Sequence, residues 1–509
     1  MNWKFWETKN TVVLNDYGTT SNPILTGVWD GEKTPGELGA VYDTMPDHLK
    51  LKLRAYDMDL KTDIIKVITG KFFKWVIGSG LKLQAEPNET VLEMSGIKED
   101  LPRFNKEVEA LFNLYSSSNY SDYHRKDWLH EKANEAFRAS FFGDCLCIIR
   151  FDNFGPNMQV IDGQQVESPL DEDGKGKGNK IVKGIEINEK GEHIAFWIYV
   201  GDLKHKRVES RNNQGMLVAW MIYGDKHRID HQRGIPRIAS ILEKVSKLDR
   251  FSEASVSKAE QVANVVFAFE HDATSTGTNI LSGSLSSKKS TEVQVSPYEK
   301  GELSAAQMRQ STSNQVFNLT PGSKLSQLST QSETTFNEFF RAVFVVLCAA
   351  VDIPEEVALQ KYEQNYSSSR AAINGWEYIA EIHRKRFAKK FYEPFYRCWL
   401  EFNILNGTIK SNGFLKAKSK GQFMAIEAYF NARFMGKKMP HIDPLKEAKA
   451  VRAMLGNDDT PLISNEQATE AVGYGDWNEN YKKYLEEDKQ IIKDEPEITN
   501  NSNNGNVVK

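Results

Sequence analysis

The chain has 509 residues, of which 65 are Lys or Arg and 69 are Asp or Glu, so its formal net charge is −4. This length suffices for roughly two to four domains with hydrophobic cores of their own. Proteins that bind DNA or RNA tightly normally carry a surplus of basic residues. The charge balance therefore excludes a typical repressor more firmly than a conduit through which a duplex slides.

The N-terminal half of the chain predicts helices first and strands second. Residues 1–49 show no sustained hydrophobic period, which indicates an N-terminal arm. Apolar residues then recur every three or four positions at 49–77, 102–115 and 127–142, which predicts three amphipathic helices. Residues 143–225 consist of short apolar runs between Gly, Asp and Pro, and they predict a small mixed β-sheet.

A long helix and a polar segment are expected after the sheet. Gly234-Ile235-Pro236 opens a helix that we expect to continue to about residue 266. Residues 272–290 are mostly Ser, Thr, Gly and Lys, and such a segment cannot bury enough apolar surface to order by itself. We interpret it as a mobile excursion or as a surface that folds only on a partner. A short helix near 302–310 and a strand at 315–319 are predicted next.

The most apolar helix of the chain is predicted at residues 334–351. It is apolar on most sides, so we expect it to be buried on most sides, either in the core of one subunit or between subunits. Arg341 interrupts its apolar run, which is shorter than the ~20 residues that a membrane-spanning helix needs. We therefore expect no membrane span.

The last long helix begins at the N-cap sequence Ser367-Ser368-Ser369 and continues to about residue 402. Pro394 has no backbone N–H to donate, so it should kink or divide this helix. Beyond residue 479 a charge-dense sequence fades into an Asn-rich end, which predicts a disordered tail.

No motif of the sequence indicates an enzyme. Phosphate-binding loops, nucleophile elbows and His-Glu-x-x-His are absent, so we expect no catalytic residue and no cofactor. His227 and His231 have no third metal ligand nearby, and Cys145 and Cys147 are interpreted as core residues of a strand. The cysteines lie in apolar runs without a signal peptide before them, which favours a reducing cytoplasm.

One charge feature stands out on the last long helix. Five basic residues, which we call the basic stripe, occur within seven positions: Arg384, Lys385, Arg386, Lys389 and Lys390. The stripe could contact nucleic acid. We favour the alternative, a solvated helix face opposite the apolar residues of the same helix.

Several local motifs occur in an order that indicates a family resemblance. The less specific ones are Gly143-Asp144, Gly184-Ile185-Glu186-Ile187-Asn188 and Leu319-Thr320-Pro321-Gly322-Ser323. The most specific ones lie at 365–376 and 442–447, with the positions Tyr366, Ser367, Arg370, Trp376, Asp443, Pro444, Lys446 and Glu447. Together with the order of elements, they resemble the lambda-type family of tailed-phage portal proteins over residues 55–485 or so.

The resemblance implies an α+β portal-type fold and a structural, non-enzymatic role. A homo-oligomeric, dodecameric ring at one capsid vertex would carry double-stranded DNA during packaging and ejection. The implied partners are the terminase large subunit, the head-tail connector proteins and the major capsid protein. The implied location is the virion, after assembly in the host cytoplasm.

The parts of the family fold can be carried over by position. They are an N-terminal arm (1–49), a wing of helices and sheet (50–233), a stem helix (234–266), a clip (267–300), a second stem segment (301–321), wing and channel helices (322–400), a crown (401–480) and a disordered tail (481–509). A candidate channel loop consists of Ser326, Gln327, Ser329, Thr330, Gln331 and Ser332. An ordinary surface turn is an equally good interpretation of that loop.

Two other functions are kept as alternatives. The first is a monomeric, helical nucleic-acid-binding packaging accessory protein that uses the basic stripe. The second is a hydrolase with an unrecognised pair of carboxylates, although no spacing of acidic residues in the sequence predicts one.

Overall fold

The computed structural model describes residues 48–170, 174–226, 229, 231–269, 315–318, 336–362, 366–437, 444–456, 461–473, 475 and 477–494. The chain divides into two compact units. Unit 1 comprises Met1–Leu242 and Cys348–Lys509, and unit 2 comprises Glu243–Leu347. The predicted N-terminal arm lies outside the described residues up to residue 47.

Unit 1 begins with helices, as predicted. They are α2 (His48–Lys61), α3 (Asp63–Phe72), a π-helical turn (Phe73–Ile77), α4 (Glu89–Met94), α5 (Leu101–Ser116) and α6 (Leu129–Phe141). The helix expected at 49–77 is divided at Thr62, whose backbone is extended with φ −109° and ψ 128°. At the break, the Met58 carbonyl accepts from both the Thr62 backbone N–H, at 2.9 Å, and the Thr62 hydroxyl, at 2.8 Å.

Strands β2 to β8 of unit 1 form two small antiparallel sheets. One has the order β3 (Gly155–Asp162), β2 (Asp144–Asp152), β8 (Ala219–Tyr223). The other is a meander of β4 (Lys180–Val182), β5 (Ile185–Ile187), β6 (His193–Gly201) and β7 (Lys204–Glu209). The single mixed sheet expected for 143–225 is therefore wrong, because these strands divide into two sheets in which every pair is antiparallel. A short turn joins β2 to β3, whereas β8 comes from a distant part of the sequence.

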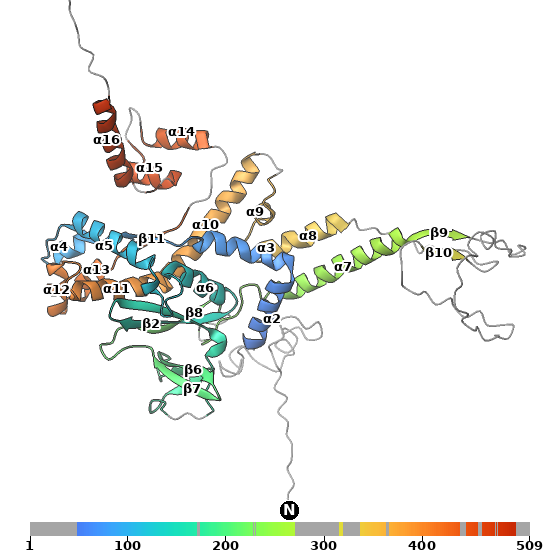
Figure 1. Ribbon diagram of the computed structural model, residues 1–509, viewed down its shortest axis with the longest axis horizontal. Coiled ribbons are helices and arrows are strands. Elements are labelled where there is room, and N and C mark those ends of the chain that lie inside the picture. Colours follow the sequence, from blue (N-terminus) through green and yellow to red (C-terminus); the bar gives the residue numbers. More distant parts are fainter. Residues whose placement is uncertain are drawn as a thin grey trace, which may run out of the picture. The chain divides into compact units, whose positions relative to one another are not determined.

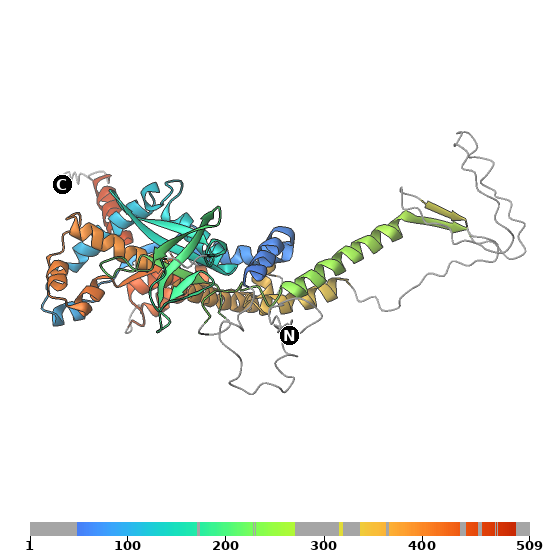
Figure 2. The same cartoon turned by 90° about the horizontal axis from the view of Figure 1, so that it is seen from below.

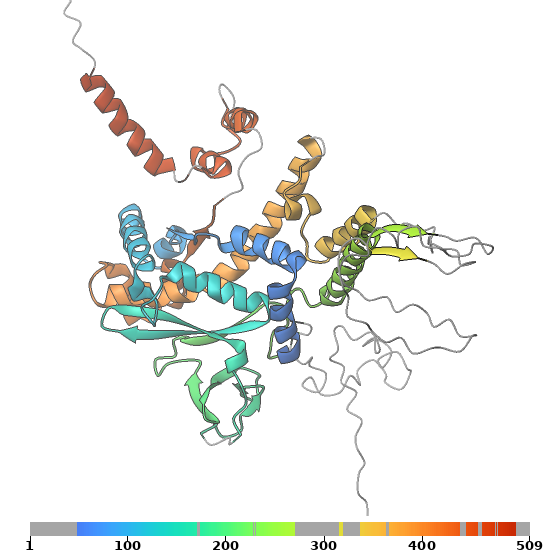
Figure 3. The same ribbon diagram turned by 45° about the vertical axis from the view of Figure 1, so that its right-hand side comes forward.

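The main sheet core follows from the two-residue period of β2. Leu146 and Ile148 belong to a cluster of buried residues contributed by both sheets, which include Ile185, Phe196 and Met221. On the opposite face of the same sheet, the Cys145 thiol donates to the Ala136 carbonyl of α6 at 3.3 Å. Figures 1 and 3 show this layering, with α6 along one face of the β2 sheet and the β6–β7 sheet on its other side.

The predicted break in the last long helix is confirmed. Helix α10 (Tyr366–Lys390) ends before α11 (Tyr392–Leu405), and Pro394 is the third residue of α11. Pro394 has no N–H for the Lys390 carbonyl four residues earlier. The indole of Trp220 on β8 donates to that carbonyl at 2.6 Å instead. The sheet thus satisfies the acceptor that the proline leaves open.

The remaining elements of unit 1 are short. They are α9 (Glu355–Leu359), α12 (Asn412–Ser419), α13 (Phe423–Tyr429), β1 (Lys82–Ala85), β11 (Ala432–Met435), α14 (Pro444–Met454), α15 (Asn465–Val472) and α16 (Trp477–Asp494). Strands β1 and β11 pair antiparallel. The disordered tail expected from residue 481 is wrong up to residue 494. Helix α16 covers this segment because its apolar residues recur with a helical period among the charges.

Unit 2 contains α7 (Leu242–Asn264), β9 (Val265–Phe269), β10 (Gln315–Asn318) and α8 (Phe336–Ala349). Helix α7 leads directly into β9, which pairs parallel with β10, as Figure 2 shows. The predicted strand at 315–319 and the predicted apolar helix at 334–351 are confirmed. The described residues contain no helix that is both long and apolar enough to cross a membrane.

The predicted start of the long helix at Gly234 is wrong, because α7 begins at Leu242. Ile235 pairs with Asp225 through both backbone hydrogen bonds, at 3.0 and 3.2 Å. The Gly234 amide donates to the Asp144 carboxylate at 3.0 Å. These long-range bonds hold the segment in an extended conformation in spite of its helix-start signal.

Candidate functional site

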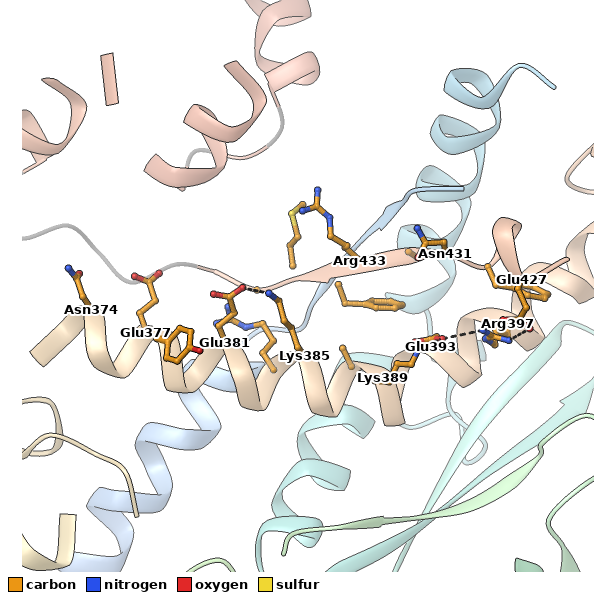
Figure 4. A pocket seen from close by; sticks show the side chains of 18 residues that line it. Asn374, Glu377, Glu381, Lys385, Lys389, Glu393, Arg397, Glu427, Asn431 and Arg433 are labelled. Atoms are coloured by element: carbon orange, nitrogen blue, oxygen red, sulfur yellow. Dashed lines mark hydrogen bonds and ion pairs between the residues drawn. The ribbon is translucent and has the colours of Figure 1, made fainter. Parts of the chain in front are cut away.

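Helix α10 carries the basic stripe between two cavities. The first, which we call the α10 groove, has a volume of about 730 Å³ and lies between α10, α11 and β11. Figure 4 shows its side chains, with Lys385 and Lys389 on α10 and Arg433 on β11. The groove is mixed in charge, since Glu377, Glu381, Glu393 and Glu427 line it as well.

The lysines of the α10 groove are paired within the chain. Lys385 contacts Glu381 at 2.7 Å, and Lys389 contacts Glu393 at 2.8 Å. Both pairs join residues four apart on a helix, the spacing at which side chains meet. Such exposed pairs neutralise charge locally but contribute little stability.

Arg397 is the centre of a second set of pairs in the groove. It donates to both carboxylate oxygens of Glu427, at 2.8 and 2.5 Å, and it contacts Glu393 at 3.3 Å. The hydrogen bonds from Arg397 lower the pKa of Glu427 below its usual range. The groove therefore combines opposite charges in fixed positions.

Arg384 of the basic stripe binds backbone carbonyls of the same chain. Its guanidinium donates to the carbonyls of Trp75 and Val76, at 2.6 and 3.2 Å, at the end of the π-helical turn. Burial lowers the pKa of Arg384. Arg384 thus holds the end of the first helical segment against α10, because it satisfies carbonyls that the turn leaves without helical partners.

Arg386 and Lys390 line a different cavity, which we call the basic pocket. Its volume is about 450 Å³, and Arg237, Lys226 and His383 also line it. The five basic residues therefore do not form one continuous row of unpaired charge. Their contact with nucleic acid stays a prediction.

The family-motif position Trp376 is a core residue. Its side chain is fully buried on α10, and its ring meets the ring of Phe72 on α3 edge to face, with centroids 5.1 Å apart. Arg370 lies half-buried in the first part of the same helix. The side chains of Tyr366 and Ser367 lie outside the described part of the chain, although both residues belong to α10.

The second family motif lies at the start of α14. Pro444 is the first residue of this helix, and Lys446 is exposed on it. Asp443 precedes the helix outside the described residues, and the side chain of Glu447 is not described. The candidate channel loop, Ser326–Ser332, and the predicted clip beyond residue 269 lie wholly outside the described ranges.

The apolar helix of unit 2 has an exposed row of large side chains. Phe336, Phe339 and Val346, which we call the α8 apolar face, are exposed on one side of the helix, and the exposed fraction of Val346 is 51%. The ring of Phe251 on α7 stacks on Phe336, with centroids 5.6 Å apart. Burial on most sides, which the sequence predicts, is not reached within the described chain.

A buried charge cluster in unit 1 was not predicted from the sequence. Asp144, at the start of β2, is completely buried and accepts two hydrogen bonds from Arg233, at 2.7 and 3.0 Å. The Lys52 ammonium lies 3.7 Å from Asp144 and 2.7 Å from Asp162. Two cations thus face two carboxylates.

Although burial opposes ionisation of Asp144, the charge of Arg233, its hydrogen bonds and Lys52 together hold the pKa of this carboxyl well below its usual range. Burial followed by the charge of Arg233 lowers the pKa of His48. The feature of the sequence that could have indicated this cluster is Gly143-Asp144, which places an acidic residue at the start of a buried strand. The residues that pair with Asp144 are remote in the sequence, so the cluster itself could not be predicted. The cluster joins α2, β2 and the segment before α7.

The two cysteines and His231 are the metal-ligand candidates that lie among the described residues. Cys145 and Cys147 are buried core residues, as predicted, and burial raises the pKa of the Cys147 thiol. His227 lies outside the described residues. Among the residues that the structure describes, no group of three or more His, Cys, Asp or Glu side chains is placed to hold a metal ion.

Comparison with known families agrees with the resemblance seen in the sequence. The model of the family described as phage portal protein, lambda family, matches residues 31–383, which is more than half of the chain. The matched range covers helices α2 to α6, strands β1 to β8, all of unit 2 and most of α10. The chain therefore belongs to the lambda family of phage portal proteins, a family of structural virion proteins.

Proposed function

We propose that the chain is the portal subunit of a tailed phage or prophage, and that its copies close into a dodecameric ring at one capsid vertex. Double-stranded DNA would pass through this ring during packaging and ejection. Membership of the portal family supports the role. The observation within the chain that carries the assembly step is the α8 apolar face.

The α8 apolar face supports assembly because it leaves apolar area open to water. Phe339 and Val346 are spaced by seven residues and share one side of the helix, with exposed fractions of 37% and 51%. Burying apolar surface stabilises by about 25 cal/mol per Å², so a neighbouring copy that covers this row gains free energy. A large exposed apolar row is typical of an interaction surface. In a ring, each copy provides the same interface.

The charge balance of the chain supports a channel that binds its DNA weakly. The net charge of the chain is −4, and the α10 groove pairs its lysines with glutamates. Tight duplex binding gains its free energy from unpaired basic residues that release counterions. A chain without a surplus of basic residues suits a duplex that must move.

The family's parts extend this proposal. Residues 50–233 and 322–400 would form the wing, 234–266 and 301–321 the stem, 267–300 the clip and 401–480 the crown. The clip would dock the terminase large subunit and later the head-tail connector proteins. The outer surface would meet the major capsid protein. The polar loop Ser326–Ser332 would face the channel.

Imaging of the purified full chain tests assembly. We expect closed rings in negative-stain images and a matching mass by mass photometry. Replacing Phe339 and Val346 together by Asp should leave monomers, because two buried charges would destabilise each interface. Leu203→Asp is the matched control, since Leu203 is 70% exposed at a turn of unit 1 and should leave rings intact. Monomers of the unmodified chain at high concentration would contradict the proposal.

The alternative, a monomeric nucleic-acid-binding accessory protein, makes a different prediction. It requires strong, salt-dependent duplex binding by the monomer, which neutralisation of the basic stripe abolishes. Binding assays on the same preparation separate the two functions.

A further inference from the structure

The basic pocket of unit 1 gathers positive charge from segments far apart in the sequence. Arg386 and Lys390 come from α10, Lys226 from the turn after β8, and Arg237 from the segment before α7. Phe137 of α6 and Phe387 of α10 add apolar walls. Its volume of about 450 Å³ is within the range of about 300–1,000 Å³ that ligand pockets usually have.

Arg237 has an unusual partner in this pocket. Its Nη1 donates to Nδ1 of His383 at 3.1 Å. A guanidinium can only donate, so the His383 ring accepts and is neutral, with its proton on Nε2. Burial, followed by the charges of Arg237 and Arg386, lowers the pKa of His383 to about 4. Burial is the main cause of the neutral state, and the two neighbouring arginines add to it.

In the described part of the chain, three of the four cations of the basic pocket have no ion pair with an acidic side chain. Within the described ranges, no carboxylate lies at ion-pair distance from Arg237, Arg386 or Lys390. Asp225 lines the pocket, and its Oδ1 accepts from the backbone N–H of Lys226. Asp225 and Asp352 favour the charged form of Arg237, yet burial and Arg386 lower its pKa.

The two sides of α10 provide the decisive contrast. Toward the α10 groove, Lys385 and Lys389 each have a glutamate at 2.7 or 2.8 Å. Toward the basic pocket, Lys390 has like charges as neighbours, and burial followed by Arg237 and Arg386 lowers its pKa. Arg386 and Lys390 remain open to solvent beside the half-buried Arg237, and the mutual repulsion of these like charges costs free energy that a bound anion would return. Groups gathered in a concave site at such a cost are typical of ligand recognition.

We propose that the basic pocket binds the phosphate group of a small anion. Arginine presents its N–H groups in a fork that matches phosphate oxygens, and several fixed cations suit a dianion better than a single carboxylate. The neutral His383 adds an N–H donor. The volume leaves room beyond one phosphate, so inorganic phosphate and a small phosphate ester are both candidate sources. This proposal does not depend on ring formation.

Thermal unfolding of the full chain in phosphate tests the proposal, with potassium chloride of equal ionic strength as the reference. The melting temperature of the unmodified protein should rise with phosphate concentration. In the double variant Arg386→Gln/Lys390→Gln, the phosphate concentration for half of this rise should be about tenfold or more higher, because two charged donors are lost. The matched control is Lys385→Gln/Lys389→Gln on the other side of α10, which should behave like the unmodified protein.

The same variants exclude a general salt effect. An equal phosphate-dependent rise in all three proteins would overturn the proposal, since it would show that phosphate acts on the whole surface. In low-phosphate buffer the pocket variant should melt at an equal or higher temperature, because like-charge repulsion is relieved. A lower melting temperature there would also overturn the proposal, since the charges would then be compensated within the protein.

Two further ligands identify the source of the phosphate. Deoxycytidine monophosphate should stabilise the unmodified protein, and its binding can be measured by calorimetry in competition with inorganic phosphate. Competition supports one shared site, and the tighter of the two ligands identifies the source. Deoxycytidine, which lacks the phosphate, should have no effect. Stabilisation by deoxycytidine equal to that by the monophosphate would contradict recognition of a phosphate group.

Discussion

Unit 1 and unit 2 differ in which side chains they bury and which they expose. Unit 1 buries the charges of Asp144 and Arg233 and satisfies them within the chain at 2.7 and 3.0 Å. Unit 2 keeps large apolar side chains such as Phe339 and Val346 exposed. The buried charges of unit 1 are thus satisfied within a single copy, whereas the proposed ring would let a neighbouring copy cover the exposed apolar side chains of unit 2. Substitutions should therefore affect folding in the first unit and assembly in the second.

The largest effect is expected at the buried charge cluster. Asp144→Asn removes the negative charge that Arg233 and Lys52 share, and a broken buried pair typically costs about 3–5 kcal/mol. Urea unfolding followed by circular dichroism should show this loss. The control Asp57→Asn alters an exposed pair with Lys61 and should cost about 0.5 kcal/mol or less. Equal losses for both variants would show that burial does not set the cost of losing a carboxylate charge in unit 1.

Acid should weaken unit 1 through histidines that are buried in the neutral form. The pKa of His383 is lowered to about 4, so the unfolded chain binds a proton below the usual pKa of about 6.5 while the folded chain does not. Stability is therefore complete above that value and falls as the pH decreases toward 4. At pH 5 the loss from His383 should be about 2 kcal/mol.

The variant His383→Gln isolates this contribution, since glutamine can still accept from Arg237 but does not titrate. Urea unfolding between pH 7 and 5 should show a loss that is smaller by about 2 kcal/mol than in the unmodified protein. An unchanged pH dependence would show that His383 does not carry the effect.

A smaller effect is expected at the junction of α10 and α11. Trp220→Phe leaves the Lys390 carbonyl without the indole donor, and one hydrogen bond of this kind contributes about 1 kcal/mol. Hydrogen exchange should become faster in the last turn of α10, together with that loss in urea unfolding. Faster exchange throughout unit 1 would instead indicate a general packing defect. Trp197→Phe, in the other sheet, serves as a comparison because its indole N–H has no partner among the described residues.

The smallest effect on stability is expected in unit 2. Val346→Ser changes an exposed side chain, so the free energy of unfolding of the monomer should change by about 0.5 kcal/mol or less. Assembly measured by mass photometry should nevertheless weaken, because apolar area that a neighbour covers is lost. A large loss of monomer stability with unchanged assembly would reverse the comparison between the two units.

Local sequence patterns determined much of the secondary structure and the family. The three-and-four spacing of apolar residues predicted α5, α6 and α8, since a helix face repeats every 3.6 residues. Pro394 predicted the division of the last long helix, because a missing N–H is a property of the residue itself. Two short motifs with the order of elements pointed to the portal family, which the family match then showed.

Only the tertiary structure decided which charges meet. Asp144 and Arg233 are 89 positions apart, and Arg237 and His383 are 146 apart, so no local period could pair them. Contacts between segments that are remote in the sequence also place the residues of the basic stripe in two cavities. They likewise make α7 begin at Leu242 instead of Gly234. Local patterns reflect the period of one element, whereas contacts between elements depend on how distant segments pack. For this reason the helices could be predicted from the sequence, and the basic pocket and the buried charge cluster could not.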